Sequence, residues 1–363
     1  MKHEKTVEWT IASTYMIGKT NKQILKNKKI AAFDMDHTLI KPINNKKFSE
    51  TDSDWELYCD SISKRLLKLS NEDYELVIIT NQKGISSGKV DIEVFKNKIK
   101  KIVNHFGLHF VILVSLEDDL YRKPRTKLWT EFILGNLETS FFCGDAAGCP
   151  NDFSDSDLKF ALNVGIKFVY RDEFLGEKVK IPPIKYAVDF SKIVTKNDYN
   201  FIKSADQEVI INVGLPASGK SHFTKNCIVP LNYIQINQDI LKTKAKCLKL
   251  FEASLSSGKS VVVDNTNLTK ENRKEYLDIA KKYKVKCRCL NFIVTKEVCI
   301  HNSYYRNYIT DGDTKVIPNL VFNIMNKKYK APELVEGFLK IDEIKFSFNS
   351  DNDSVKLYTQ FFY

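Results

Sequence analysis

The sequence predicts an α/β protein with two domains, each built on a doubly wound parallel sheet. Short apolar runs that suit buried strands alternate with stretches of helical periodicity along the whole chain. Two of these runs end in polar loops, IAAFDMDHT at residues 30–38 and VIINVGLPASGKS at residues 209–221. A chain of 363 residues is also too long for one typical core. We therefore expect two domains, each with a polar loop at the end of a buried strand.

The first half alternates strand and helix patterns at the spacing of β–α units. The expected strands are residues 30–33, 76–80, 110–114, 140–143 and 167–170, and the expected helices are residues 54–70, 90–106 and 129–137. Residues 1–28 are polar with scattered aromatic side chains, and we interpret them as a lead-in to the first strand. The first domain is expected to span residues 1–185.

The second half repeats the alternation after a stretch with two prolines and mixed polarity, residues 176–207. We place a junction at residues 186–207 and a second domain at residues 208–363. The expected strands are residues 208–213, 233–236, 260–263 and 286–294, and the expected helices are one that begins at residue 220 and residues 239–256, 270–283, 296–306 and 316–325.

Composition limits the class of protein. The chain has 56 Lys and Arg and 45 Asp and Glu residues, a formal net charge of +11. Such a charge favours polyanions, but lysines spread over solvated faces explain it equally well. The eight cysteines contain no CxxC pair, which argues against structural zinc and for reduced thiols inside a cell. We expect no membrane segment, because no 18 apolar residues run together. A nuclear or a cytoplasmic location stays open, as does a viral replication site if the chain is virus-encoded.

Five polar side chains are expected to meet beyond the carboxyl ends of the first sheet's strands. Asp34 can attack phosphorus, and Asp36 can protonate the leaving oxygen and then activate water. Thr80 can hydrogen-bond a phosphoryl oxygen, and Lys123 offers positive charge. Asp34, Asp36 and Asp145 are the expected ligands of Mg²⁺, which prefers carboxylates. A tight turn with solvated carboxylates is the alternative, but it leaves the other three positions unexplained.

The segments DMDHT, ITNQKG, RKP and CGDAAG resemble the signature segments of haloacid-dehalogenase-type phosphatases. They resemble more closely the phosphatase domain of the polynucleotide kinase 3′-phosphatase family, which implies Asp34 as nucleophile and Asp36 as general acid and base. One departure is His37, where the family usually has Gly and where a positive φ would suit His less well. We expect activity to survive with a small backbone adjustment.

Three acidic residues follow these segments, Asp152, Asp155 and Asp157. One of them, with Asp157 favoured, is expected to support the metal or to orient Lys123. A helix N-terminus explains the acidic residues almost as well, so the choice stays open.

The sequence GLPASGKS fits the pattern GxxxxGK[ST], follows an apolar strand and precedes a helix. Its backbone N–H groups can cradle the β-phosphate of a nucleotide, with Lys220 on the β- and γ-phosphates and Ser221 on Mg²⁺. The expected nucleotide-binding residues are Gly214, Leu215, Pro216, Ala217, Ser218, Gly219, Lys220, Ser221 and Asp264.

Three further residues have a functional interpretation, and two of them, Asp239 and Arg306, also have a plain structural one. Asp239 is either a base for an attacking hydroxyl or a helix cap. Asp264, at the end of SVVVD, suits a contact to Mg²⁺ or to water. Arg306 is either a clamp on phosphates or a surface arginine.

The segments NQD, VVVDNTN, KCRCLNF and APELVEGFLKIDEIKF resemble the kinase domain of the same family. This resemblance implies Asp239 as the base for a 5′-hydroxyl and Arg306 as an arginine of the lid. Two departures are Gln238, where the family usually has Arg, and a lid helix that keeps only Arg306.

The resemblance covers about residues 8–347 and implies a bifunctional enzyme that removes 3′-phosphates through an aspartyl-phosphate and phosphorylates 5′-hydroxyls with ATP and Mg²⁺. The implied partners are DNA ends, with RNA ends as a variant, and functionally a downstream ligase. We expect a monomer. The N-terminal phosphopeptide-binding domain of the animal enzymes is not expected in this sequence. A fusion of a small-metabolite phosphatase with a kinase, and a non-catalytic binding protein, are the alternatives.

Overall fold

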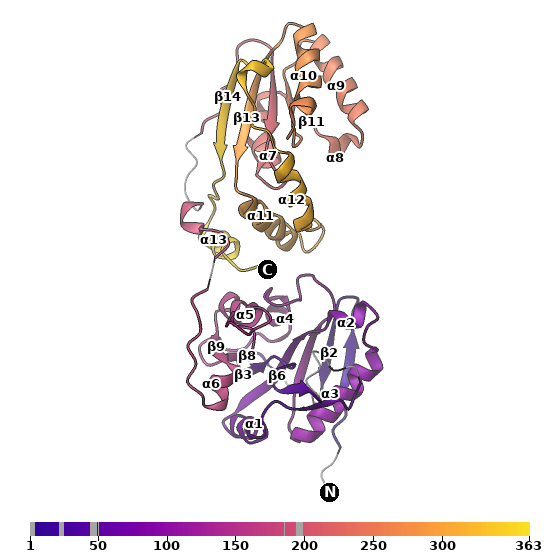
Figure 1. Ribbon diagram of the computed structural model, residues 1–363, viewed down its shortest axis with the longest axis vertical. Helices are drawn as coiled ribbons and strands as arrows, with labels where there is room; N and C mark the ends of the chain where they lie inside the picture. The colour runs from indigo at the N-terminus through magenta and orange to yellow at the C-terminus, as the bar shows by residue number, and fades with distance from the viewer. Residues whose placement is uncertain (1–3, 22–24, 44–48, 50, 185, 194–198) are drawn as a thin grey trace. The chain divides into compact units, whose positions relative to one another are not determined.

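The computed structural model describes residues 4–21, 25–43, 49, 51–184, 186–193 and 199–363. The chain divides into two compact units (Figure 1). The first consists of Met1–Lys185 with the last four residues, Gln360–Tyr363, and the second of Tyr186–Thr359. The predicted junction, residues 186–207, is thus grouped with the second unit.

The first unit is built on a seven-stranded sheet with the order β1-β2-β7-β6-β3-β8-β9. Its strands are β1 (Glu8–Ile11), β2 (Tyr15–Lys19), β3 (Lys29–Phe33), β6 (Tyr74–Asn81), β7 (Val111–Ser115), β8 (Phe141–Gly144) and β9 (Lys167–Tyr170). The five strands from β7 to β9 in this order are parallel, whereas β1 and β2 form an antiparallel hairpin on the β7 edge. The interpretation of residues 1–28 as a lead-in to the first strand was therefore wrong, because residues 8–19 of this segment form two strands of the sheet.

Helices cover the sheet of the first unit (Figure 1). They are α1 (Ser61–Asn71), α2 (Lys83–Ser86), α3 (Ile92–Phe106), α4 (Lys127–Phe132), α5 (Ser156–Val164) and α6 (Arg171–Leu175). Alternate residues of β3 pack into different cores: Ala31 and Phe33 join one cluster, and Ile30 and Ala32 join the other. Burial on both faces explains why the strand reads as one apolar run.

Two predicted helices of this unit are shorter than expected. The predicted helix at residues 54–70 begins only at Ser61, because Trp55–Leu57 forms β5, which pairs antiparallel with β4 (Ile40–Pro42). The predicted helix at residues 129–137 ends at Phe132. Leu134 has a φ of 50°, a left-handed conformation that is incompatible with a right-handed helix.

The second unit is built on a five-stranded parallel sheet with the order β11-β12-β10-β13-β14. Its strands are β10 (Glu208–Val213), β11 (Ile234–Ile236), β12 (Val261–Val263), β13 (Lys286–Ile293) and β14 (Lys340–Lys345). Its α-helices are α7 (Lys220–Phe223), α8 (Gln238–Leu241), α9 (Lys244–Ser256), α10 (Lys270–Lys282), α11 (Lys296–Ile309), α12 (Asn319–Lys328) and α13 (Asn352–Tyr358). The predicted α/β class with parallel sheets is confirmed.

The helix predicted at residues 239–256 is two helices. Lys242 has a φ of 71°, which ends α8, and the Thr243 side chain accepts a hydrogen bond from the Lys246 N–H and starts α9. The helix predicted from residue 316 begins at Asn319, because Pro318 precedes it in an extended conformation. Within the described residues, no helix is long and apolar enough to cross a lipid bilayer.

Candidate active sites

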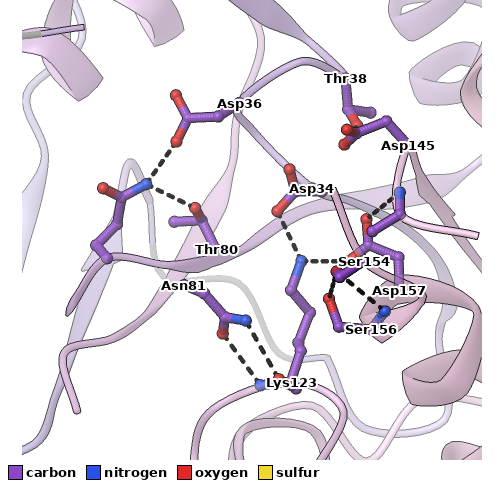
Figure 2. A network of polar contacts seen from close by, with 12 residues as sticks. Asp34, Asp36, Thr38, Thr80, Asn81, Lys123, Asp145, Ser154, Ser156 and Asp157 are labelled. Atoms are coloured by element: carbon purple, nitrogen blue, oxygen red, sulfur yellow. Dashed lines mark hydrogen bonds and ion pairs between the residues drawn. The ribbon is translucent and has the colours of Figure 1, made fainter. Parts of the chain in front are cut away.

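The first site lies where β3, β6 and β8 end in the first unit (Figure 2). Asp34 follows β3, Thr80 is near the end of β6, and Asp145 follows β8. Lys123 comes from the loop between β7 and α4. These strands are parallel neighbours, so their carboxyl ends place the four side chains at one edge of the sheet.

Lys123 is the centre of the charge network. Its side chain is buried, and its Nζ lies 2.6 Å from Asp34 Oδ1 and 2.8 Å from Asp157 Oδ1. Its backbone N–H donates to Asn81 Oδ1 at 3.0 Å, which fixes the loop to the end of β6. Burial lowers the pKa of Lys123, but Asp157 and Asp34 more than offset it and raise this pKa above its ordinary value. Lys123 is therefore charged at neutral pH.

Three carboxylates crowd around this lysine. One oxygen each of Asp34, Asp145 and Asp157 lie within 4.8 Å of one another. Burial, followed by the neighbouring carboxylates, raises the pKa of Asp34 well above its usual range, although Lys123 opposes this. Burial and the charge of Asp157 raise the pKa of Asp145 to about 6. A group of hard oxygen ligands with excess negative charge fits a Mg²⁺ ion, whose charge would relieve the repulsion.

The carboxylate of Asp36 lies outside this group. It accepts a hydrogen bond from Gln82 Nε2 at 2.6 Å, and the same Nε2 donates to Thr80 Oγ1 at 2.9 Å. The carboxylate positions therefore give no support to the predicted metal role of Asp36, because this side chain is bound by Gln82 and is not part of the group of three carboxylates. Gln82 lies in the quoted segment ITNQKG, but the sequence interpretation assigned it no role.

The three acidic residues left open by the sequence have three different surroundings. Asp157 contacts Lys123, and a Cβ on Gly144 would collide with its carboxylate. Asp152 Oδ2 accepts hydrogen bonds from two backbone N–H groups, those of residues 147 and 149. Asp155 precedes α5 and pairs with Lys159 at 2.8 Å. Only Asp157 of the three contacts the lysine of the site.

We expect Asp157→Asn to lower the phosphatase rate by about 10- to 100-fold, because it removes a charge that holds Lys123 while the side-chain shape is kept. The matched control is Asp155→Asn, on the same segment, which should leave the rate within about twofold. Initial rates on a 3′-phosphorylated oligonucleotide measure both. Equal losses in the two variants would contradict the role of Asp157.

The second site is the loop between β10 and α7 in the second unit. Lys220 is buried, and its Nζ donates to the carbonyl oxygens of Gly214 at 2.9 Å and Leu215 at 2.6 Å, and to Ser218 Oγ at 3.2 Å. Gly219 has a φ of 95°, which requires glycine. Burial lowers the pKa of Lys220 to about 8. The loop thus curls around its own lysine, in a form that a phosphate group can enter by replacing the carbonyl partners.

Asp264 lies at the centre of a buried polar network beside this loop. It is 2% exposed and accepts hydrogen bonds from Gln235 Nε2 at 2.7 Å and Asn237 Nδ2 at 3.1 Å. Asn212 Nδ2 donates to Asp264 Oδ1 at 3.4 Å and to Thr224 Oγ1 at 2.8 Å. Among the described atoms, Asn212 Oδ1 is buried without a donor. An orphaned acceptor next to a carboxylate fits a water or a hydrated Mg²⁺.

Asp239 and Arg306 both belong to the second unit, and both are exposed. Asn237, not Asp239, caps α8, because its Oδ1 accepts hydrogen bonds from the N–H groups of Asp239 and Ile240. The alternative that Asp239 caps the helix is thus wrong. Asp239 is exposed. The surrounding protein lowers the pKa of Arg306, and the negative charge of Asp239 partly offsets this. Ser221, the second residue of α7, is also exposed.

Two supporting residues were not predicted. Asn302 of α11 donates from Nδ2 to the carbonyl oxygen of Ala217 at 2.9 Å, and Tyr358 of α13 donates from its hydroxyl to Asn302 Oδ1 at 2.6 Å. Ala217 has a φ of 56°, so this contact holds a left-handed residue of the loop. Neither contact has a signal in the local sequence, because 85 and 56 residues separate the partners.

Comparisons with known proteins find related families for both parts of the chain. Residues 29–175 match the family Polynucleotide kinase 3 phosphatase, and residues 242–332 match the family AAA domain. A bifunctional polynucleotide phosphatase/kinase of Schizosaccharomyces pombe is 37% identical over 349 residues, which cover 94% of this chain and 85% of that protein. A putative bifunctional polynucleotide phosphatase/kinase of Acanthamoeba polyphaga mimivirus is 34% identical over 400 residues, with 96% and 92% covered. This chain therefore belongs to the bifunctional polynucleotide phosphatase/kinase family.

Proposed function

We propose that this protein removes 3′-phosphates from nucleic acid ends with its first unit and phosphorylates 5′-hydroxyl ends with its second. One observation carries the proposal above all: a single chain places Asp34 against Lys123 in one unit and a phosphate-cradling loop with Lys220 in the other. The products, a 3′-hydroxyl and a 5′-phosphate, are the ends that a ligase joins.

In the phosphatase reaction, the Asp34 carboxylate attacks phosphorus and the bond to the 3′-oxygen breaks, which leaves an aspartyl-phosphate. Lys123, 2.6 Å from Asp34, favours the ionised nucleophile against the effect of burial. Asp36 protonates the leaving oxygen and then takes a proton from the water that hydrolyses the intermediate. Thr80 donates a hydrogen bond to the phosphoryl group.

Mg²⁺ is the proposed metal of both units. Asp34, Asp145 and Asp157 would hold it in the first unit, and Ser221 would hold it in the second, where Asp264 would contact it or its water. When bound, it supplies positive charge to phosphoryl oxygens. The contribution that the sequence predicts for Asp36 stays a prediction.

In the kinase reaction, ATP is the proposed donor. The backbone N–H groups of Ala217 to Lys220 bind the β-phosphate, and Lys220 turns from its carbonyl partners to the β- and γ-phosphates. Asp239 takes the proton of the attacking 5′-hydroxyl, and Arg306 supports the transferred phosphoryl group. The effect of the Asp239 charge on the pKa of Arg306 supports this pairing.

The proposed substrate is a DNA end, with RNA ends as a variant, and the proposed form is a monomer that acts before a ligase. The net charge of +11 suits a polyanion and predicts binding that weakens steeply with salt. A nuclear or cytoplasmic site of action, or a viral replication site, is compatible with this substrate.

A nicked duplex with a 3′-phosphate and a 5′-hydroxyl tests the function directly. With Mg²⁺ and ATP the protein should convert both ends, and without the metal neither conversion should occur. Excess single-stranded DNA should compete with both reactions, whereas a small-metabolite enzyme would ignore it. Absence of both conversions in the presence of Mg²⁺ and ATP would rule out the polynucleotide function.

A further inference from the structure

His37 lies in the loop between β3 and β4, residues 34–39, which is the first phosphate-handling loop, and its backbone conformation is left-handed. Its φ is 58°, a region that glycine enters freely and that a residue with a Cβ enters at a free-energy cost. Figure 2 shows its two neighbours, Asp36 and Thr38, on opposite sides of Asp34. A contact that holds the His37 peptide therefore also holds Asp36 relative to Asp34.

Arg171, the first residue of α6, makes such a contact. Its Nη1 donates to the carbonyl oxygen of His37 at 2.9 Å, across 134 residues of sequence. Its Nε donates to Asp172 Oδ1 at 2.6 Å, and its guanidinium carbon lies 4.0 Å from the centre of the Tyr58 ring. The side chain is 13% exposed. Contacts on three sides fix the plane of the guanidinium.

The aromatic platform under Arg171 is attached to the same loop. Tyr58 follows β5, and its N–H donates to the carbonyl oxygen of Leu39 at 3.1 Å. Arg171 therefore joins β9 and α6 to the loop both directly at His37 and through Tyr58. A planar guanidinium can stack and donate in its own plane together, which a lysine ammonium cannot do.

We propose that Arg171 is a positioning residue of the phosphatase site, which holds the His37 peptide in the left-handed turn so that Asp36 can transfer protons at the group attached to Asp34. The contacts that Arg171 makes with His37, Asp172 and Tyr58 are all with protein atoms, so the proposed role is to hold the loop in place. This inference rests on the proposed phosphatase function. It adds to that function a positioning residue that lies outside the loop of residues 34–39.

The test is a double-mutant cycle between residues 37 and 171, with kcat and KM measured on a 3′-phosphorylated oligonucleotide and on p-nitrophenyl phosphate. Arg171→Ala should lower kcat about tenfold and change KM less than about twofold. Arg171→Lys should not restore kcat. In the His37→Gly background, Arg171→Ala should lower kcat less than about threefold, because glycine keeps the turn without the contact.

Arg65→Ala is the matched control, because Arg65 Nη2 donates at 2.6 Å to the backbone carbonyl of Leu175, the last residue of the same helix α6. It removes an arginine–carbonyl contact of α6 but leaves the contact with His37 in place. It should leave kcat unchanged. If thermal unfolding shows that Arg171→Ala does not fold, Tyr58→Leu takes its place in the cycle. Tyr58→Leu should lower kcat about threefold when residue 37 is His and should not lower it when residue 37 is Gly.

Three results would overturn the proposal: an equal loss of kcat in both backgrounds, a rise in KM at constant kcat, or no loss at all. A protein inactive on the oligonucleotide but active on p-nitrophenyl phosphate would contradict the proposed substrate. The cycle measured on the small ester would still decide the role of Arg171.

Discussion

Asp34→Ala is expected to abolish the 3′-phosphatase activity, by about 1,000-fold or more, and to leave the 5′-kinase at the wild-type rate. The side chain is the proposed nucleophile, and no other described carboxylate lies as close to Lys123. Release of phosphate from a 3′-phosphorylated oligonucleotide measures the loss. Transfer of labelled phosphate to a 5′-hydroxyl oligonucleotide on the same preparation measures the kinase.

Asp34→Asn is the companion variant, because it keeps the shape of the side chain. Burial raises the pKa of Asp34 well above its ordinary value, so the ionised carboxylate lowers the stability of the folded protein at neutral pH. The amide removes that cost. Without divalent cations, the unfolding midpoint of Asp34→Asn at pH 7 should therefore equal or exceed that of the wild type, although the phosphatase is lost. Retained phosphatase activity in both variants would contradict the assignment of Asp34 as the nucleophile.

Lys220→Ala is expected to reduce the 5′-kinase by about 100-fold or more and to leave the 3′-phosphatase unchanged. The lysine is the buried cation of the phosphate-cradling loop, with Gly214, Leu215 and Ser218 as its present partners. Without it, neither the β- nor the γ-phosphate has a positively charged side chain from this loop. Kinase rates over a range of ATP concentrations separate weaker binding from slower transfer.

Lys220→Met controls for the packing of the side chain. The methionine fills most of the space of the lysine stem but carries no charge, so it should lose as much kinase activity as the alanine variant. Kinase activity in the methionine variant near the wild-type rate would show that packing, not charge, is the contribution of Lys220. The phosphatase rate on the same preparation reports on the integrity of the first unit.

The sequence predicted most of each sheet, because buried parallel strands need continuous apolar runs and the loops after them need polar residues. It missed the hairpin of β1 and β2 in the first sheet and the edge strand β14 in the second. Gly18 of this hairpin lies against the Trp9 ring, where a Cβ would be 2.9 Å from the nearest ring atom. That requirement becomes visible only once the two strands are paired.

The roles of acidic residues were harder to predict, since an Asp near a helix start suits both a cap and a site. Asn237 proved to be the cap of α8, and Asp239 is exposed. Among the three acids after β8, burial against Lys123 singles out Asp157. Such choices depend on contacts across many residues, which local sequence patterns do not contain.

By itself, the sequence determined the α/β class, the two phosphate-handling loops and the family that they resemble, because these depend on local periodicity and on residues close together in the chain. Only the tertiary structure decided where the side chains of Asp36 and Asp157 point, and which residue holds His37. Hydrogen bonds such as that of Arg171 to His37 form between elements 134 residues apart. Their geometry exists only after the sheet has brought the strand ends together.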